Sequence, residues 1–294
     1  LGADRPGDIR ILTRILRPSV GIVTSVGPSH LETFGTVRAV AEEKWNLVRD
    51  LPADAPAFVN ADSPELARLA AAAGRPRLVT AGLETGDVRG RVVSAVPRLA
   101  LELDDPPLRL ATALVGRQNA TNLLLAALCA LELGVGPRAI EERAASFRPV
   151  ARRMEPRAAR FGVVLDDVYN ANLASMSAAL HALAEFETSS LRVAVLGDML
   201  GLGDAAPALH EELARLALSL SVDLVYPVGE RAEAAFGATG DRRVLRMERG
   251  EIAADVVARL ADASDAVVLV KGSRGVRLET IADEILRRSP ADGA

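Results

Sequence analysis

Polar and aromatic side chains crowd a short stretch of the segment LDDVYNANLASMSAAL (residues 165–180), namely Asp166, Asp167, Tyr169, Asn170 and Asn172. The segment begins like the end of a buried strand and finishes like a helix. Two carboxylates and two amides at such a corner could hold a polar ligand such as a ribose. They could equally satisfy the backbone of the turn, with Asn172 or Ser175 capping the helix. The residues alone leave both interpretations open.

Two further segments follow strand-like runs and could bind anions. VKGSRG (270–275) offers Lys271, Ser273 and Arg274 as an anion site. Its alternative is a solvated basic loop in which Gly272 and Gly275 turn the chain. VLGDMLGLGDAAPALH (195–210) has glycines after a strand, but their spacing does not match G-x-G-x-x-G and favours a tight turn over a phosphate site.

Two residues of the first half are weaker candidates. His30 follows a strand in SVGPSHLETFG (25–35), where a metal ligand and a structural histidine are equally good interpretations. Lys44 lies in the helical segment AEEKWNLV, and an exposed lysine is the default there. The phosphate-loop pattern G-x-x-x-x-G-K-[ST] does not occur in these 294 residues, so any nucleotide chemistry would need more chain.

The composition excludes several classes of protein. The net charge of -4, with basic and acidic residues interspersed, argues against nucleic-acid binding. The single Cys129 lies in an apolar run and is expected to be buried, which fits a reducing compartment, and we expect the cytoplasm. No apolar run reaches the roughly 20 residues of a membrane span. We expect a monomer.

The elements that must position these residues alternate between short strands and longer helices. This alternation predicts an α/β protein with parallel sheets, and a doubly wound second domain. A basic, proline-containing stretch at 148–162 indicates a linker, so we predict domains at 1–150 and 151–294. Residues 77–115 are predicted to form an antiparallel appendage. In the second domain we predict strands at 162–167, 192–196, 223–228, 243–247 and 266–270 and helices at 174–186, 205–220, 230–237, 250–262 and 276–288. Ligands of such sheets bind at the carboxyl ends of the strands, where the polar segments fall.

Taken in order, these segments resemble the blocks of the Mur ligase family. The resemblance runs from Leu1 to about Glu279 through LGADRPGDI, TSVGPSHLETFGTVRAVAEEK, GRQNATNLLLAAL, RRMEP, LDDVYNANLASMSAAL, VLGDMLGLGDAAPALHEELA and VLVKGSRGVRLE. It is closest to the branch that joins D-alanyl-D-alanine to UDP-N-acetylmuramoyl-tripeptide. Gln118, Leu173 and Gly201 depart from the pattern, where a histidine, a proline and a glutamate are usual.

The resemblance implies an ATP- and Mg2+-dependent amide ligase of peptidoglycan precursor synthesis that works through an acyl phosphate. It implies a central ATP-binding domain followed by a Rossmann-like ligase domain. His30 would be a magnesium ligand, and Lys44 would be carbamylated, which turns a cation into a carboxylate-like ligand. The remaining assignments place Asn119 on the adenine, Arg153 on an ATP phosphate, Asp167 on the ribose, Tyr169, Asn170 and Asn172 along the nucleotide and substrate side, and Lys271, Ser273 and Arg274 near the substrate peptide.

Two alternatives stay open. One is the branch that adds the third amino acid, which Lys44 followed by Trp45 favours, although no D-[DN]-P-R signature is present. The other is a noncatalytic binding module that has lost its phosphate loop. We expect the family's front part, with the UDP-binding domain, the phosphate loop and an acidic metal ligand, to be missing before Leu1, and this chain alone to be inactive. A phosphate-loop sequence in frame upstream of Leu1 would discriminate between these possibilities.

Overall fold

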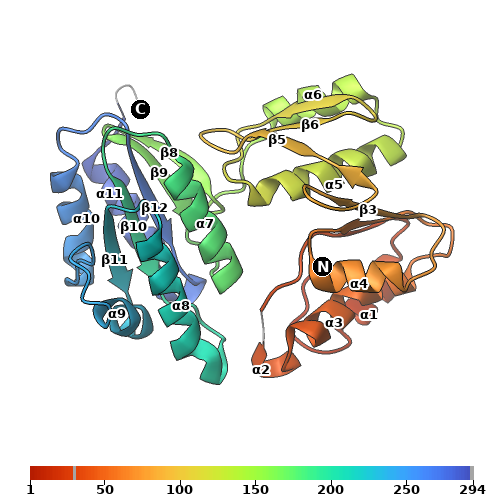
Figure 1. The fold of residues 1–294 in the computed structure, drawn as a ribbon, viewed down its shortest axis with the longest axis horizontal. Helices are drawn as coiled ribbons and strands as arrows, with labels where there is room; N and C mark the ends of the chain where they lie inside the picture. The colour runs from red at the N-terminus through yellow and green to blue at the C-terminus, as the bar shows by residue number, and fades with distance from the viewer. Residues whose placement is uncertain (29–30, 292–294) are drawn as a thin grey trace. The chain divides into compact units, whose positions relative to one another are not determined.

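The computed structural model describes residues 1–28 and 31–291. The chain divides into two compact units (Figure 1). Unit 1 comprises residues 1–113 and 117–147, and unit 2 comprises residues 114–116 and 148–294.

Unit 1 combines a parallel sheet with a small antiparallel one. The parallel sheet has the order β1-β2-β3-β4, and the antiparallel sheet has the order β5-β6-β7. The strands are β1 (Gly21–Val23), β2 (Ala57–Asn60), β3 (Leu78–Gly82), β4 (Val88–Arg89), β5 (Arg91–Ser94), β6 (Ala100–Leu103) and β7 (Leu108–Ala111). The helices are α1 (Asp8–Leu16), α2 (Leu31–Phe34), α3 (Val37–Asp50), α4 (Pro64–Ala71), α5 (Gln118–Glu132) and α6 (Pro137–Ser146).

The core of unit 1 lies between the parallel sheet and helices α3 and α4. Trp45 and Val48 of α3 pack with Val59 of β2 and Leu66 of α4. The start of α3 is fixed by Thr36, whose side chain accepts a hydrogen bond from Ala39 N at 3.1 Å. Cys129 is buried, as predicted.

Unit 2 is a five-stranded sheet with the order β11-β10-β12-β9-β8, in which only β8 is antiparallel to its neighbour. The strands are β8 (Glu155–Ala159), β9 (Gly162–Asp167), β10 (Arg192–Gly197), β11 (Leu224–Val228) and β12 (Ala266–Lys271). The α-helices are α7 (Leu173–Glu185), α8 (Ala206–Ser219), α9 (Glu230–Gly237), α10 (Arg249–Arg259) and α11 (Glu279–Arg288), and 3-10 turns occupy Gly203–Ala205 and Arg274–Val276.

The central strands of unit 2 are covered on both faces. Helices α7 and α8 lie on one face of the sheet, and α10 and α11 lie on the other (Figure 1). Val193 and Val195 of β10 pack in the cluster that includes Val256 of α10 and Ile285 of α11. All six residues of β12 are buried, which is why its first five residues, AVVLV, form a continuous apolar run rather than an alternating pattern. The predicted α/β class is confirmed.

Three predictions about elements were wrong. Residues 77–115 are not wholly antiparallel, because β3 and β4 belong to the parallel sheet. The linker at 148–162 contains β8, an edge strand, the position at which a sheet tolerates Pro156. The predicted strand at 243–247 is reduced to a single bridge between Val225 and Val244. A short strand-like pattern carries no information about its pairing partner, which explains the first error. β8 was missed because its sequence, EPRAA, has little apolar periodicity.

Among the described residues, no helix combines the length and the apolar character that a membrane span requires.

Candidate nucleotide and substrate site

The loops that follow β9, β10 and β12 emerge at one edge of the sheet of unit 2, because these strands are parallel. The last residues of β9 and β12, Asp167 and Lys271, are register partners. Most of the sequence-predicted site residues of unit 2 therefore belong to a single strand-end edge. Asn119 and Lys44 belong to unit 1, and His30 lies outside the described residues.

A buried ion pair joins Asp167 to Lys271. The ammonium group of Lys271 lies 2.7 Å from Asp167 Oδ2 and donates to the backbone oxygen of Asn170 at 3.0 Å. Asp167 Oδ1 accepts from Met154 N at 3.1 Å. Lys271 is only 2% exposed, whereas the Asp167 side chain keeps 15% exposure. The buried ammonium group of Lys271 thus fixes the orientation of Asp167, and of the two side chains only the Asp167 carboxylate remains accessible to solvent.

The neighbouring Asp166 is fully buried and lies in a separate charge cluster. Its Oδ2 accepts from Arg152 Nη1 at 2.6 Å and from Arg157 Nη1 at 3.0 Å. Both arginines also bind Asp283 of α11, at 2.8–3.0 Å. We call Arg152, Arg157, Asp166 and Asp283 the charge quartet. Burial raises the pKa of Asp166, and the two guanidinium groups only partly oppose this shift.

The partly exposed Asp283 behaves differently from Asp166. Burial favours its neutral form, but the hydrogen bonds from Arg152 and Arg157 outweigh that effect and lower the pKa of Asp283. Each arginine therefore joins a wholly buried carboxylate, that of Asp166, to one near the surface, that of Asp283. The second oxygen of Asp166, Oδ1, has no hydrogen-bond partner among the described residues.

The ring of Tyr169 contacts the guanidinium groups of two arginines. The guanidinium carbon of Arg153 lies 4.0 Å from the centre of the Tyr169 ring, and that of Arg274 lies 5.4 Å from it. Tyr169 is 41% exposed, so its ring is accessible. This cluster can offer an aromatic face and positive charge to a planar or anionic ligand.

The two asparagines of this corner have local backbone roles. Asn172 Oδ1 accepts from Ser175 N at 2.9 Å, and Ser175 Oγ accepts from Asn172 N at 3.1 Å, which forms a capping box for α7. Asn170 Oδ1 accepts from Ala171 N at 2.9 Å. The capping role considered for Asn172 and Ser175 is confirmed, and it leaves the amide nitrogen of Asn172 outside the cap.

Ser273 ties the three strand-end loops together. Its hydroxyl accepts from Leu200 N at 2.9 Å and donates to Ala171 O at 3.3 Å, and the residue is 3% exposed. The following loop is not the solvated turn considered above, because Gly272 packs against Gly197, where an added Cβ would meet the Gly197 Cα at 3.0 Å. Of the three predicted residues in VKGSRG, only Arg274 lies at the surface.

The sequence interpretation missed His210. This histidine of α8 is fully buried, its Nε2 accepts from Met199 N at 3.0 Å, and its Nδ1 lies 2.7 Å from Ala206 O. These contacts require the hydrogen on Nδ1, which donates to the Ala206 carbonyl. His210 thereby holds the loop after β10. The helical segment PALHEEL offered no signal that this histidine faces inward.

The candidates of unit 1 are less defined. Lys44 lies half-buried in α3, Asn119 lies in the first turn of α5, and His30 lies outside the described residues. The neighbouring Glu43 is buried, and its carboxylate accepts from Gly7 N and Ile9 N, both at 2.9 Å, so it caps α1.

The described residues do not provide a complete set of ligands for the predicted magnesium ion. Across residues 1–28 and 31–291, no three His, Cys, Asp or Glu side chains are grouped so as to hold a metal ion. An unmodified lysine is a cation and cannot be a metal ligand. The residues described do not fit a metal ion by themselves.

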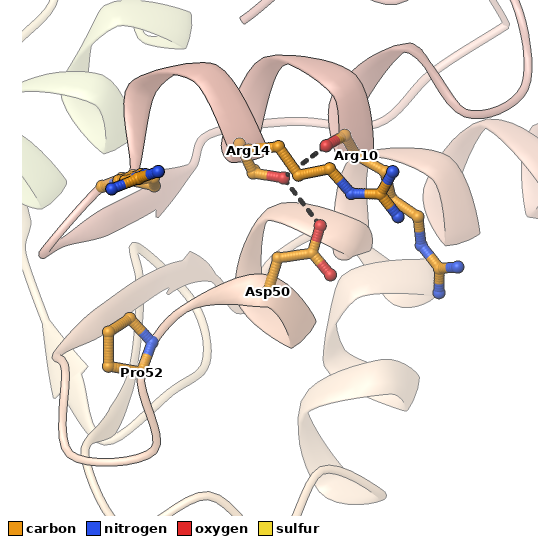
Figure 2. A pocket seen from close by; sticks show the side chains of 7 residues that line it. Arg10, Arg14, Asp50 and Pro52 are labelled. Carbon is orange, nitrogen blue, oxygen red and sulfur yellow. Dashed lines mark hydrogen bonds between the residues drawn. The ribbon is translucent and has the colours of Figure 1, made fainter.

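A pocket of about 560 Å3 lies in unit 1, and none of the predicted site residues is among those that line it. Figure 2 shows Arg10 and Arg14 of α1 together with Asp50 and Pro52 around it. Thr13 Oγ1 donates to Asp50 Oδ2 at 2.7 Å. The pocket is open and contains none of the strand-end chemistry of unit 2.

Comparison with known protein families covers most of the chain. Residues 1–130 match the Mur ligase middle domain, and residues 152–274 match the Mur ligase glutamate ligase domain. The chain belongs to the Mur ligase family. The segment that matches the glutamate ligase domain of Mur ligases contains the whole strand-end edge described above.

The relatives agree with this assignment. The chain is 33% identical to the UDP-N-acetylmuramoyl-tripeptide--D-alanyl-D-alanine ligase of Mycobacterium tuberculosis (strain CDC 1551), over 97% of this chain and 61% of that protein. It is similar to MurF from Acinetobacter baumannii (TM-score 0.86, 26% identity, 98% of this chain and 64% of that one). It is also similar to MurF ligase from Thermotoga maritima in complex with ADP (TM-score 0.84, 26% identity, 97% and 65%). This Mur ligase chain thus spans about three fifths of the length of the relatives it matches.

Proposed function

We propose that this chain is the nucleotide-binding and ligase part of an enzyme that adds D-alanyl-D-alanine to UDP-N-acetylmuramoyl-tripeptide with ATP. The observation that carries the proposal is the strand-end edge of unit 2, where Asp167, Tyr169 and Arg153 present a carboxylate, an aromatic face and a guanidinium. The name of the M. tuberculosis relative supports this substrate pair.

The chemistry proposed is an acyl-phosphate ligation. The tripeptide carboxylate takes the γ-phosphoryl group of ATP and releases ADP. The amino group of D-alanyl-D-alanine then attacks the acyl carbon, and phosphate leaves as the amide forms. Cationic groups near the transferring phosphoryl group stabilise the charge that develops, and Arg153 is our candidate in this chain.

The nucleotide roles follow the chemistry of each side chain. Asp167 would accept hydrogen bonds from ribose hydroxyls, because Lys271 holds its carboxylate in place and the side chain stays 15% exposed. Arg153 would meet a phosphate, with Tyr169, Asn170 and Asn172 lining the same ligand. Asn119 would contact the adenine. Residues 1–150 would be the ATP-binding domain, and residues 151–294 the ligase domain.

The substrate roles are revised by the geometry of unit 2. Arg274 remains our candidate for contact with the substrate peptide, because it is exposed beside Tyr169. Lys271 and Ser273 are buried and already engaged, so we propose that they position the site rather than touch the peptide. Mg2+ would require His30 and a carbamylated Lys44 as ligands.

A second candidate is the branch that adds the third amino acid, and a third is a noncatalytic module. We rank both lower because the M. tuberculosis relative named above is a D-alanyl-D-alanine ligase, and because Asp167, Arg153 and Lys271 form an intact constellation. A noncatalytic module places no demand on such an arrangement.

The test is a ligation assay that follows phosphate release with UDP-N-acetylmuramoyl-tripeptide, D-alanyl-D-alanine, ATP and Mg2+. We expect no turnover by residues 1–294 alone, because this sequence has no phosphate loop, and turnover by the same chain extended upstream in frame to include one. Turnover with a single amino acid but not with D-alanyl-D-alanine would favour the second candidate. Absence of turnover in an extended chain that binds ATP would favour the third.

A further inference from the structure

The turn at residues 152–154 has an unusual backbone. Arg152 has φ 64 and Met154 has φ 50, so two residues with side chains adopt the left-handed region on either side of Arg153. Such residues persist only where their surroundings hold them in place, and they are concentrated at functional sites. The question is what holds this turn.

The first anchor is the side chain of Arg152. Its guanidinium joins the fully buried Asp166, at 2.6 Å, to Asp283 of α11, at 2.9 Å. A planar guanidinium can donate to two carboxylates at once, which a lysine ammonium does less well. The charge quartet thus fixes the first residue of the turn against β9 and α11.

The second anchor is the backbone on either side of Arg153. Tyr169 N donates to Arg152 O at 3.1 Å, and Met154 N donates to Asp167 Oδ1 at 3.1 Å. The Met154 side chain is buried, at 3% exposure. Both neighbours of Arg153 are therefore tied to the end of β9, whereas Arg153 itself is exposed and lies over the Tyr169 ring.

From this arrangement we propose that Arg152, held by Asp166 and Asp283, is a positioning residue that aims Arg153 across Tyr169. Arg152 touches no ligand in this account and acts only through the residue that follows it. The inference rests on the proposed function, because Arg153 is our candidate for the ATP phosphate. The charge quartet would then be the part of unit 2 that positions the Arg153 guanidinium.

The chain offers a matched control in Arg157. This arginine binds the same two carboxylates, Asp166 and Asp283, but it belongs to β8 and not to the turn. Arg152→Lys and Arg157→Lys each keep a positive charge in the quartet, so neither leaves buried Asp166 without a cation. A purely electrostatic role of the quartet predicts equal effects of the two variants, whereas positioning predicts an effect of Arg152→Lys alone.

The readout is the NMR ring-current shift that Tyr169 imposes on the side-chain protons of Arg153 in residues 1–294, assigned with Tyr169→Leu. We expect Arg152→Lys to lose more than half of this shift and Arg157→Lys to retain it. If Arg152→Lys retains the shift, or if both variants lose it equally, the proposal is wrong. If a lysine variant does not fold, Asp283→Asn weakens the anchor at a half-exposed carboxylate and should reduce the shift in part; an unchanged shift would also count against the proposal.

A binding measurement separates this inference from the proposed function. With ADP as the probe, we expect Arg153→Ala to weaken binding about tenfold, the loss of one charge-assisted hydrogen bond. Arg152→Lys should weaken binding in the parent chain and add nothing further in Arg153→Ala. If Arg152→Lys loses the ring-current shift while Arg153→Ala binds ADP like the parent, the positioning role stands and the phosphate role of Arg153 falls.

Discussion

Replacing the buried Lys271 by methionine tests how the strand-end edge is held together. The substitution removes the cation that lies 2.7 Å from Asp167 and keeps most of the side-chain volume. Breaking a buried ion pair by removing one partner costs about 3–5 kcal/mol. Asp167 keeps the hydrogen bond from Met154 N and 15% exposure, so the lower end of that range applies. We expect the free energy of unfolding of unit 2 to fall by about 3 kcal/mol. For a domain of this size, that loss corresponds to a fall in Tm of roughly 6–12 °C.

Chemical denaturation followed by far-UV circular dichroism measures this loss. Arg215→Met is the control, because the pair of Arg215 with Glu211 is exposed and should contribute less than about 0.5 kcal/mol. In the double variant Lys271→Met/Asp167→Asn, the new amide oxygen at position 167 still accepts from Met154 N and no charge is left unpaired. The double variant should therefore be about 2 kcal/mol more stable than the sum of the two single effects predicts. A loss below about 1 kcal/mol for Lys271→Met, or no coupling with Asp167→Asn, would refute the buried pair.

Three further predictions concern acid stability and the proposed chemistry. The hydrogen bonds from Arg243 lower the pKa of Asp241 from 3.8 to about 2, so ionised Asp241 stabilises the fold above about pH 4 and this contribution disappears as the pH falls through 2. Asp241→Asn should therefore be less stable than the parent at pH 7, and urea titrations should show the difference closing between pH 4 and pH 2; a constant difference would contradict the cause given. In a chain extended to include a phosphate loop, Asp167→Ala should raise the ATP dissociation constant about tenfold, whereas an unchanged value removes the ribose role. In the same protein Lys44→Ala should lose activity that short carboxylic acids partly restore, and no rescue would argue against carbamylation.

Much of unit 2 could be predicted from the sequence because its strands are buried on both faces. The continuous apolar run AVVLV and the helix that begins after Asn172 can both be recognised from the local sequence. The strand β8 was not predicted, because EPRAA has little apolar periodicity and its pairing with β9 depends on residues elsewhere in the chain. The same limit applies to the candidate site.

Asp166 and Asp167 are adjacent in the sequence, yet they lie in different charge clusters. Alternation along a strand sends their side chains to opposite faces. The two arginines that bind Asp166 also bind Asp283, which lies more than a hundred residues farther along the chain and has no local signature. Likewise, the basic, glycine-containing sequence around Lys271 gave no sign that this lysine is almost fully buried.

The most direct test of the central claim is to map where a nucleotide binds this chain. Backbone amide shifts of residues 1–294 can be followed during titration with ADP. We predict shifts that saturate together at residue 153 and across residues 167–172 of unit 2. Shifts confined to the pocket of Arg10 and Arg14, or no shifts at the strand-end edge at millimolar ADP, would contradict it.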